Sequence, residues 1–167
     1  MTSPPTARGR YAAVSVAIVV AVVAIDQATK AWAASALEHH TIHVIGGTVL
    51  LQLGRNSGAA FSSFQGFTPL LAVLAIVVAA VLARIVRRSD DPWTVCALSL
   101  VLGGALGNLC DRVFRAPGFL RGEVVDFVRL GWFPTFNAAD SAITIGAILL
   151  VLFGWRAPRE RVDGDAR

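Results

Sequence analysis

The chain has 167 residues, of which 55% are hydrophobic, and it carries a net charge of +4. The apolar residues fall into long runs separated by short polar blocks, which is the pattern of an integral membrane protein rather than a soluble domain. No basic stripe with interleaved aromatic residues and no nucleic-acid-binding motif is present, so nucleic acid is excluded as a partner. Cys96 and Cys110 form no CxxC pair and are interpreted as small packing residues, not as a disulfide framework.

Four apolar runs are long enough to cross a membrane as helices. They cover residues 11–25 with a pattern that extends to residue 32, and then about 67–86, 93–109 and 138–155. A cleavable signal peptide is the alternative for the first run, because Arg8 and Arg10 precede it and small residues at 31 and 33 follow it. Polar residues interrupt the end of that run and three more runs follow, so we interpret it as a retained helix.

The segment after the first run predicts a β-hairpin. Residues 41–45 and 48–53 are rich in β-branched and apolar residues, and Gly46 and Gly47 lie between them. We expect a small sheet on the outer membrane surface. Three histidines lie in the same region and could suggest a metal site, but no carboxylate or cysteine pattern accompanies them. We therefore expect exposed polar residues and no metal or cofactor; the histidines are His39, His40 and His43.

The arginines predict the orientation of the chain, because basic residues accumulate on the cytoplasmic side. They precede the first run, lie between the second and third, and follow the fourth, so both termini are expected in the cytoplasm. The predicted fold class is an all-α integral membrane protein of four transmembrane helices with a small extracytoplasmic β-sheet. Residues 11–156 form its single domain, with the hairpin at about 40–56, and residues 1–10 and 157–167 form disordered cytoplasmic tails.

Polar clusters stand at the outer ends of the four runs. Ionisable residues at membrane depth are costly, so they indicate a functional site by default. The sequence has no HExxH motif for zinc and no GxSxG turn for a nucleophilic serine, which leaves carboxylates as the reactive groups. Asp126 lies in an apolar block and Asp140 in the first turn of the fourth helix. Two carboxylates close together share one proton, and such a pair can activate water to cut a peptide bond.

Structural roles explain each of these residues equally well when it is taken alone. Asn137 could cap the fourth helix, with Asp140 at the third helical position. Asp126 could pair with Arg129 or Arg112, and Asp26 and Lys30, four residues apart, could form one ion pair. The convergence of the polar clusters on one side of the membrane favours a functional site.

The polar clusters together resemble the lipoprotein signal peptidase (signal peptidase II) family. The matching blocks, in chain order, are DQATK from Asp26, NSGAAF from Asn56, GGALGNLCDR from Gly103, VVDF from Val124 and FNAAD from Phe136. The resemblance extends from about residue 24 to residue 155 and shows no departure at these motif positions.

The resemblance implies an aspartic intramembrane protease of the bacterial cytoplasmic (inner) membrane with a periplasmic β-cradle. It would remove signal peptides from prolipoproteins whose cysteine carries a diacylglyceryl group, cutting on the amino side of that cysteine. Its catalytic pair would be Asp126 and Asp140. The expected partners are lipidated prolipoproteins and membrane lipid, and the expected state is a monomer. The residues expected to bind substrate or to steady the pair are Asp26, Lys30, Asn56, Gly58, Gly104, Asn108, Arg112 and Asn137.

Two other functions compete with a protease. A small transporter or channel would use intramembrane charges as an ion path, but its charges usually lie in the middle of the spans, often with repeat symmetry. A non-catalytic assembly factor would bind lipid or peptide only. Asn substitutions at Asp126 and Asp140 distinguish these functions, because only a protease of the proposed kind loses cleavage.

Overall fold

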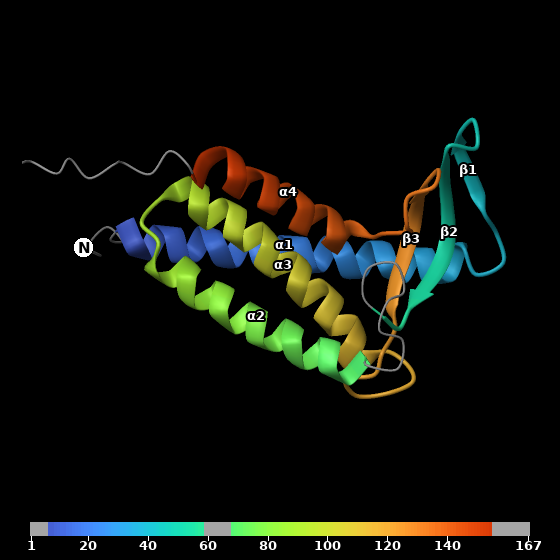
Figure 1. Cartoon of the computed structure of the whole chain (residues 1–167), viewed down its shortest axis with the longest axis horizontal. Coiled ribbons are helices and arrows are strands. Elements are labelled where there is room, and N and C mark those ends of the chain that lie inside the picture. The colour runs from blue at the N-terminus through green and yellow to red at the C-terminus, as the bar shows by residue number, and fades with distance from the viewer. Residues whose placement is uncertain (1–6, 59–67, 155–167) are drawn as a thin grey trace, which may run out of the picture.

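The computed structural model describes residues 7–58 and 68–154, which form four helices and three strands (Figure 1). Three of the helices are long and apolar enough to cross a membrane, which makes the chain a membrane protein by length and composition. The fourth is shorter. In chain order the elements are α1 (Ala7–Ala36), β1 (Ile42–Ile45), β2 (Val49–Asn56), α2 (Thr68–Arg88), α3 (Pro92–Phe114), β3 (Val124–Leu130) and α4 (Ala138–Gly154).

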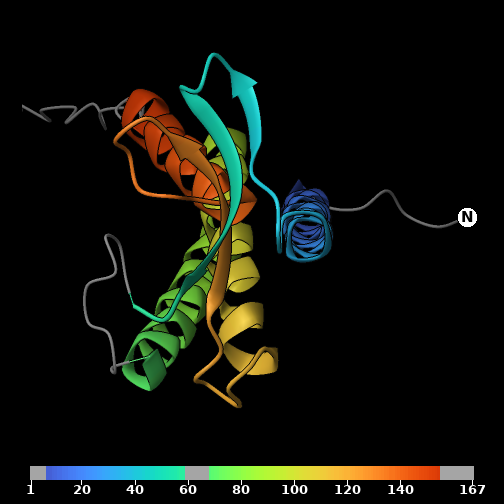
Figure 2. The same cartoon turned by 90° about the vertical axis from the view of Figure 1, so that its right-hand side faces the viewer.

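Helix α3 lies at the centre of the bundle and packs against α1, α2 and α4 (Figures 1 and 2). Glycines allow its closest contacts. A Cβ atom at Gly103 would lie 2.8 Å from Cβ of Val22 on α1, and one at Gly104 would overlap the carbonyl oxygen of Ala139 on α4. Small residues of this kind let helix backbones approach closely in membranes. Helix α2 instead exposes many large apolar side chains, as expected of a helix that faces lipid.

Two helices extend beyond their predicted bounds. Helix α1 begins at Ala7, so residues 7–10 belong to a helix and not to a tail. Alanine and arginine are both good helix formers, and hydropathy alone cannot detect where a helix continues into polar sequence. For the same reason α3 runs to Phe114, past the predicted end at residue 109. The predicted tails at 1–6 and 157–167 lie outside the described residues.

The predicted hairpin is confirmed. Strands β1 and β2 pair antiparallel, and Gly46 and Gly47 connect them with φ angles of +49° and +80°. Positive φ at both turn positions matches the twist of the strands and is easily adopted by glycine. Strand β3 adds to β2, so the order is β1-β2-β3. The sheet lies across one end of the bundle, at the end opposite the N-terminus of α1 (Figure 1).

The sequence analysis did not predict β3 as a strand. Residues 124–127 are all buried, so the segment lacks the apolar and polar alternation of a half-exposed strand. Its pairing with β2 places Asp126 opposite Gly54, directly above the helix ends. A third strand therefore positions one of the two predicted catalytic residues.

The contact at Gly104 predicts a loss of stability when a methyl group is added there. Gly104→Ala pushes α4 away from α3 and should lower the free energy of unfolding by about 2 kcal/mol, the range of overpacked cores. Thermal unfolding in detergent measures the effect. Ala80→Val, at an exposed position of α2, is the control and should unfold at the wild-type temperature. Equal unfolding temperatures for both variants would contradict this packing role.

Candidate functional site

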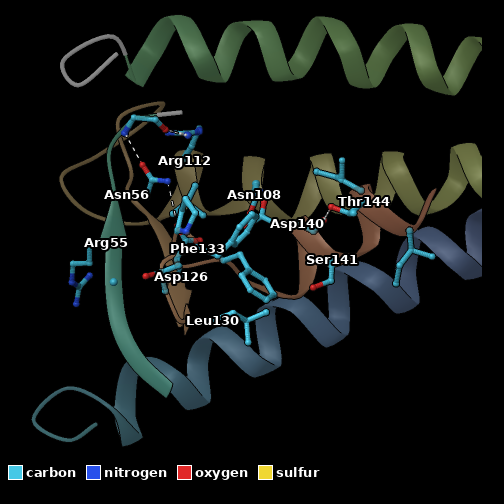
Figure 3. Close-up of a pocket in the computed structure, with 18 of the residues that line it drawn as sticks. Arg55, Asn56, Asn108, Arg112, Asp126, Leu130, Phe133, Asp140, Ser141 and Thr144 are labelled. Atoms are coloured by element: carbon cyan, nitrogen blue, oxygen red, sulfur yellow. Dashed lines mark hydrogen bonds between the residues drawn. The ribbon is translucent and has the colours of Figure 1, made fainter. Parts of the chain in front are cut away.

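A cavity of about 1050 Å³ lies under the sheet at the ends of α3 and α4. Residues from β2, α3, β3 and α4 line it, so segments far apart in the sequence build one site (Figure 3). Most of its wall is apolar. The polar or small residues that line it and were predicted as site residues are Asn56, Gly58, Asn108, Arg112, Asp126 and Asp140.

Asp140 lies in the first turn of α4, in a reciprocal cap with Asn137. The backbone N–H of Asp140 donates to Oδ1 of Asn137 at 3.0 Å, and the backbone N–H of Asn137 donates to Oδ2 of Asp140 at 3.2 Å. This is a capping box, and it lies at the positive end of the helix dipole. The predicted cap is confirmed, and it fixes the side chain of Asp140 at the cavity.

Asp126 projects from β3 into the same cavity and is 5% exposed. Its Oδ1 accepts from Nδ2 of Asn137 at 2.6 Å, and its Oδ2 accepts from Nδ2 of Asn56 at 3.2 Å. Burial, and next the nearby charge of Asp140, raise the pKa of Asp126 to about 6. Asp126 and Asp140 therefore line one cavity, and the charge of Asp140 acts on Asp126.

Asp126 forms no close ion pair with Arg112 or Arg129 in the described part of the chain, although the charge of Asp126 acts on Arg112. Among the described residues, Arg112 donates through Nη2 to the carbonyl oxygen of Gly58 at 2.7 Å, and Arg129 donates to the carbonyl oxygen of Gly131 at 3.3 Å. The Nη1 atom of Arg112 is buried and has no hydrogen-bond partner in the described part of the chain. A buried donor left unpaired is costly.

A turn at the end of β2 holds Asn56 in place. Oδ1 of Asn56 accepts from the backbone N–H of Gly58 at 3.0 Å, which leaves its Nδ2 free to face Asp126. Thr68, at the start of α2, donates to the carbonyl oxygen of Ser57 at 2.5 Å. This hydrogen bond joins the turn after β2 to the start of α2.

Asp26 and Lys30 form the predicted ion pair, with Nζ of Lys30 2.8 Å from Oδ2 of Asp26. Neither side chain has exposed surface, and neither lines the cavity. Neither side chain therefore faces the cavity in this structure. Oδ1 of Asp26 instead accepts from the backbone N–H of Ala139 at 2.9 Å and so satisfies one of the free N–H groups at the start of α4.

Gly104 also lies away from the cavity lining, because it is buried between α3 and α4. Its role is close helix packing and not a contact with substrate. Three of the predicted binding residues, Asp26, Lys30 and Gly104, thus support the site from behind it.

Asp111 is a residue that the sequence analysis missed. It is fully buried, its Oδ2 lies 2.8 Å from Nζ of Lys30, and its Oδ1 lies 2.6 Å from Nε of Arg115. Oδ2 also accepts from the backbone N–H of Val125, the residue before Asp126. The available signal was its spacing: Asp111 and Arg115 are four residues apart on a helix that was predicted to end at residue 109.

Within the described residues, no group of three or more His, Cys, Asp or Glu side chains could hold a metal ion. The side chains of His39, His40 and His43 are exposed, as expected. The carboxylate side chains that line the cavity, among the described residues, are those of Asp126 and Asp140.

The raised pKa of Asp126 predicts how its contribution to stability depends on pH. Because the folded pKa of about 6 lies above the ordinary value of 3.8, this contribution is complete below pH 3.8 and is lost as the pH rises through 6. Asp126→Asn removes the titration. Between pH 4 and pH 7.5, the free energy of unfolding of the variant relative to wild type should therefore rise by about 2 kcal/mol.

Thermal unfolding in detergent at the two pH values measures this change. Glu38→Gln, at an exposed position after α1, is the control for loss of a carboxylate. A difference between Asp126→Asn and wild type that stays constant with pH would show that Asp126 is not destabilised as a carboxylate.

Comparison with known proteins identifies the family. The family model for signal peptidase (SPase) II matches residues 18–156. A lipoprotein signal peptidase of Rhodococcus jostii is 52% identical over 132 residues, which are 78% of this chain and 67% of that protein. A lipoprotein signal peptidase of Mycobacterium avium is 44% identical over 158 residues, which are 92% of this chain and 87% of that protein.

Solved structures agree with the sequence comparison. A bacterial membrane enzyme determined by the in meso method at 2.3 Å superposes with a TM-score of 0.78 at 31% identity, covering 93% of this chain and 95% of that one. A second, at 1.9 Å, gives a TM-score of 0.75 at 33% identity, covering 87% and 95%. With the family model matched over most of its length, this chain belongs to the signal peptidase II family of membrane proteases.

Proposed function

We propose that this protein removes signal peptides from bacterial prolipoproteins that carry a diacylglyceryl group, cutting on the amino side of the lipidated cysteine. The observation that carries the proposal is the meeting of Asp126 and Asp140 at one cavity, with Asn137 bonded to both. Family membership gives the substrate class, and the geometry supports the aspartic chemistry.

In the proposed reaction one carboxyl group is ionised and the other holds the shared proton. The ionised group accepts a proton from water as the water oxygen attacks the scissile carbonyl carbon. The protonated group donates to the carbonyl oxygen, which becomes a hydroxyl in the tetrahedral intermediate. When the intermediate collapses, the peptide C–N bond breaks and the leaving amine takes up the proton gained from water. One hydroxyl group of the intermediate returns its proton to the carboxylate that had donated to the carbonyl oxygen, which gives the new carboxyl end and restores the pair. No metal and no covalent intermediate is required.

The cavity has a polar part, which would contact the peptide backbone of a substrate, and an apolar part, which would contact its apolar groups. Arg112 lines the cavity and adds a positive charge to its polar part. Asn56, Asn108 and Asn137 donate to the carboxylates and hold their orientation. The side chains of the apolar wall suit an acyl chain or an apolar segment of the substrate; they include Leu130, Phe133, Phe136, Ile143 and Ile145.

The proposed orientation has four transmembrane helices and both termini in the cytoplasm. Arg84, Arg87 and Arg88 lie at the end of α2 remote from the sheet (Figure 1), where the positive-inside rule places the cytoplasm. The cavity then lies at the outer end of the bundle, at the depth where a cysteine with acyl chains in the bilayer would present its peptide bond. The 17 residues of α4 reach the lower limit for a span.

Access for a signal peptide is proposed from the side. Helix α3 separates α2 from α4, and those two helices make no extensive contact in the described structure (Figure 2). A substrate helix could lie between them against α3, with its cleavage site at the cavity. Because one chain supplies every group of the site, we propose that the monomer is active.

Loss of either carboxylate tests the catalytic pair. Asp126→Asn and Asp140→Asn should each reduce cleavage of a diacylglyceryl-modified prolipoprotein by about 10⁴-fold, because water activation and carbonyl protonation each need one carboxyl group. Purified variants in detergent, assayed by gel shift of the precursor, give the measurement. Glu38→Gln serves as the control and should cleave at the wild-type rate. Cleavage by both aspartate variants at more than a tenth of that rate would reject the pair.

A chelator tests the absence of a metal from the reaction. Incubation of the wild-type protein with EDTA, followed by the same cleavage assay, should leave the rate unchanged, because carboxylates alone activate the water. Loss of activity that returns on addition of a divalent metal ion would contradict the mechanism.

A further inference from the structure

The ammonium group of Lys30 makes three close contacts and has no exposed surface. Nζ lies 2.8 Å from Oδ2 of Asp26, 2.8 Å from Oδ2 of Asp111 and 2.8 Å from Oδ1 of Asn108. An ammonium has three N–H donors, so each one is used. Two of these contacts balance charge, whereas the third, to a neutral amide, does not.

The third contact fixes the orientation of the Asn108 side chain. Lysine only donates, so the oxygen of the Asn108 amide must face Lys30 and its nitrogen must face away. Nδ2 of Asn108 then donates to Oδ1 of Asp140 at 2.8 Å. The other donor to the oxygen of Asn108 is Nδ2 of Asn137, at 3.2 Å, and that group forms its shorter bond with Asp126. Among the described residues, Lys30 therefore forms the shorter hydrogen bond to the oxygen of Asn108 and is its only charged donor.

The direction of the Asn108 amide matters because a carboxylate accepts hydrogen bonds, whereas a protonated carboxyl group also donates one. An amide N–H directed at Asp140 favours its ionised form; an amide oxygen in the same place would favour the protonated form. The charged groups around this position are Arg55 on β2, Asp126 on β3, Arg112 and Asp111 on α3, and Asp26 and Lys30 on α1.

We propose that Lys30 is a positioning residue that keeps Asp140 the ionised member of the pair by holding Asn108 with its amide N–H directed at Asp140. Asp126 then holds the shared proton. The assignment rests on the proposed aspartic function and adds to it a division of roles. Asp140 accepts the proton from water, and Asp126 donates to the scissile carbonyl oxygen. The place of Asp140 at the start of α4 favours the same assignment, because the helix dipole stabilises a negative charge there.

The test is the pH profile of kcat for cleavage of a diacylglyceryl-modified prolipoprotein. Lys30→Met alone would leave buried carboxylates uncompensated, so it is combined with Asp26→Asn. The double variant retains the Asp111–Arg115 ion pair, and the asparagine oxygen can still accept from the backbone N–H of Ala139. Its acid limb, where the ionised member takes up a proton, should move to higher pH by about one unit, so that activity on that limb falls about tenfold. KM should stay unchanged, because Lys30 does not line the cavity.

Two control variants separate this effect from a general loss of structure. Asp26→Asn alone retains Lys30 and should not move the acid limb upward. Ser99→Ala removes the buried hydrogen bond of 2.8 Å between Ser99 and Ser15, in the same α1–α3 interface. It should lower the unfolding temperature without moving the acid limb. An unchanged acid limb in the folded double variant, or an equal upward shift in Ser99→Ala, would overturn the proposal.

An Asn108→Ala background tests whether Lys30 acts through Asn108. Asn108→Ala alone should move the acid limb upward, and adding Asp26→Asn with Lys30→Met should then move it no further. If the added changes shift the limb in this background as much as in wild type, the charge of Lys30 acts directly and the proposal is wrong. If the double variant does not fold, the unchanged acid limb of Asn108→Ala would by itself reject the proposal.

The aspartate variants keep this inference distinct from the proposed function. If both Asp126→Asn and Asp140→Asn retain cleavage, the proposed catalytic pair is wrong. If both lose cleavage, and substitution of Lys30 does not shift the acid limb, only the proposed role of Lys30 is wrong.

Discussion

The buried ammonium of Lys30 is the interaction on which the rest of the site depends. It joins α1 to α3 through Asp111 and Asn108, and Asp111 in turn holds the backbone of β3 at Val125. Buried charges are expensive unless they are paired and hydrogen-bonded. Asp26 and Asp111 are balanced by Lys30 and Arg115, so the group is neutral as a whole. A site made from several separate segments is thereby held in one geometry.

Asn137 both caps α4 and forms a hydrogen bond with Asp126 of the proposed catalytic pair. Its oxygen caps α4 by accepting from the backbone N–H of Asp140, which forces its amide nitrogen toward Asp126. The oxygen of this amide forms the cap, and its nitrogen contacts Asp126. A helix cap and a functional site are therefore not alternatives here, because the capping geometry is what orients the two aspartates.

Two buried polar groups at the site lower the stability of the folded protein. Asp126 is buried near a second carboxylate, and both conditions raise its pKa toward 6. Such a group is more easily protonated near neutral pH, as a general acid must be. The buried Nη1 of Arg112, which has no hydrogen-bond partner among the described residues, is a second local cost.

The sequence by itself determined the apolar helices, the hairpin at Gly46 and Gly47, and the cap formed by Asn137 and Asp140, because hydropathy, turn chemistry and capping act between near neighbours. Only the tertiary structure decided that residues 124–130 form a strand, that Gly104 packs helices together, and that Lys30 lies behind the cavity. Those features depend on which distant segments meet: Lys30 and Asn108 are 78 positions apart. A pattern of residue types shows that polar groups share one end of a bundle, but packing decides which of them touch.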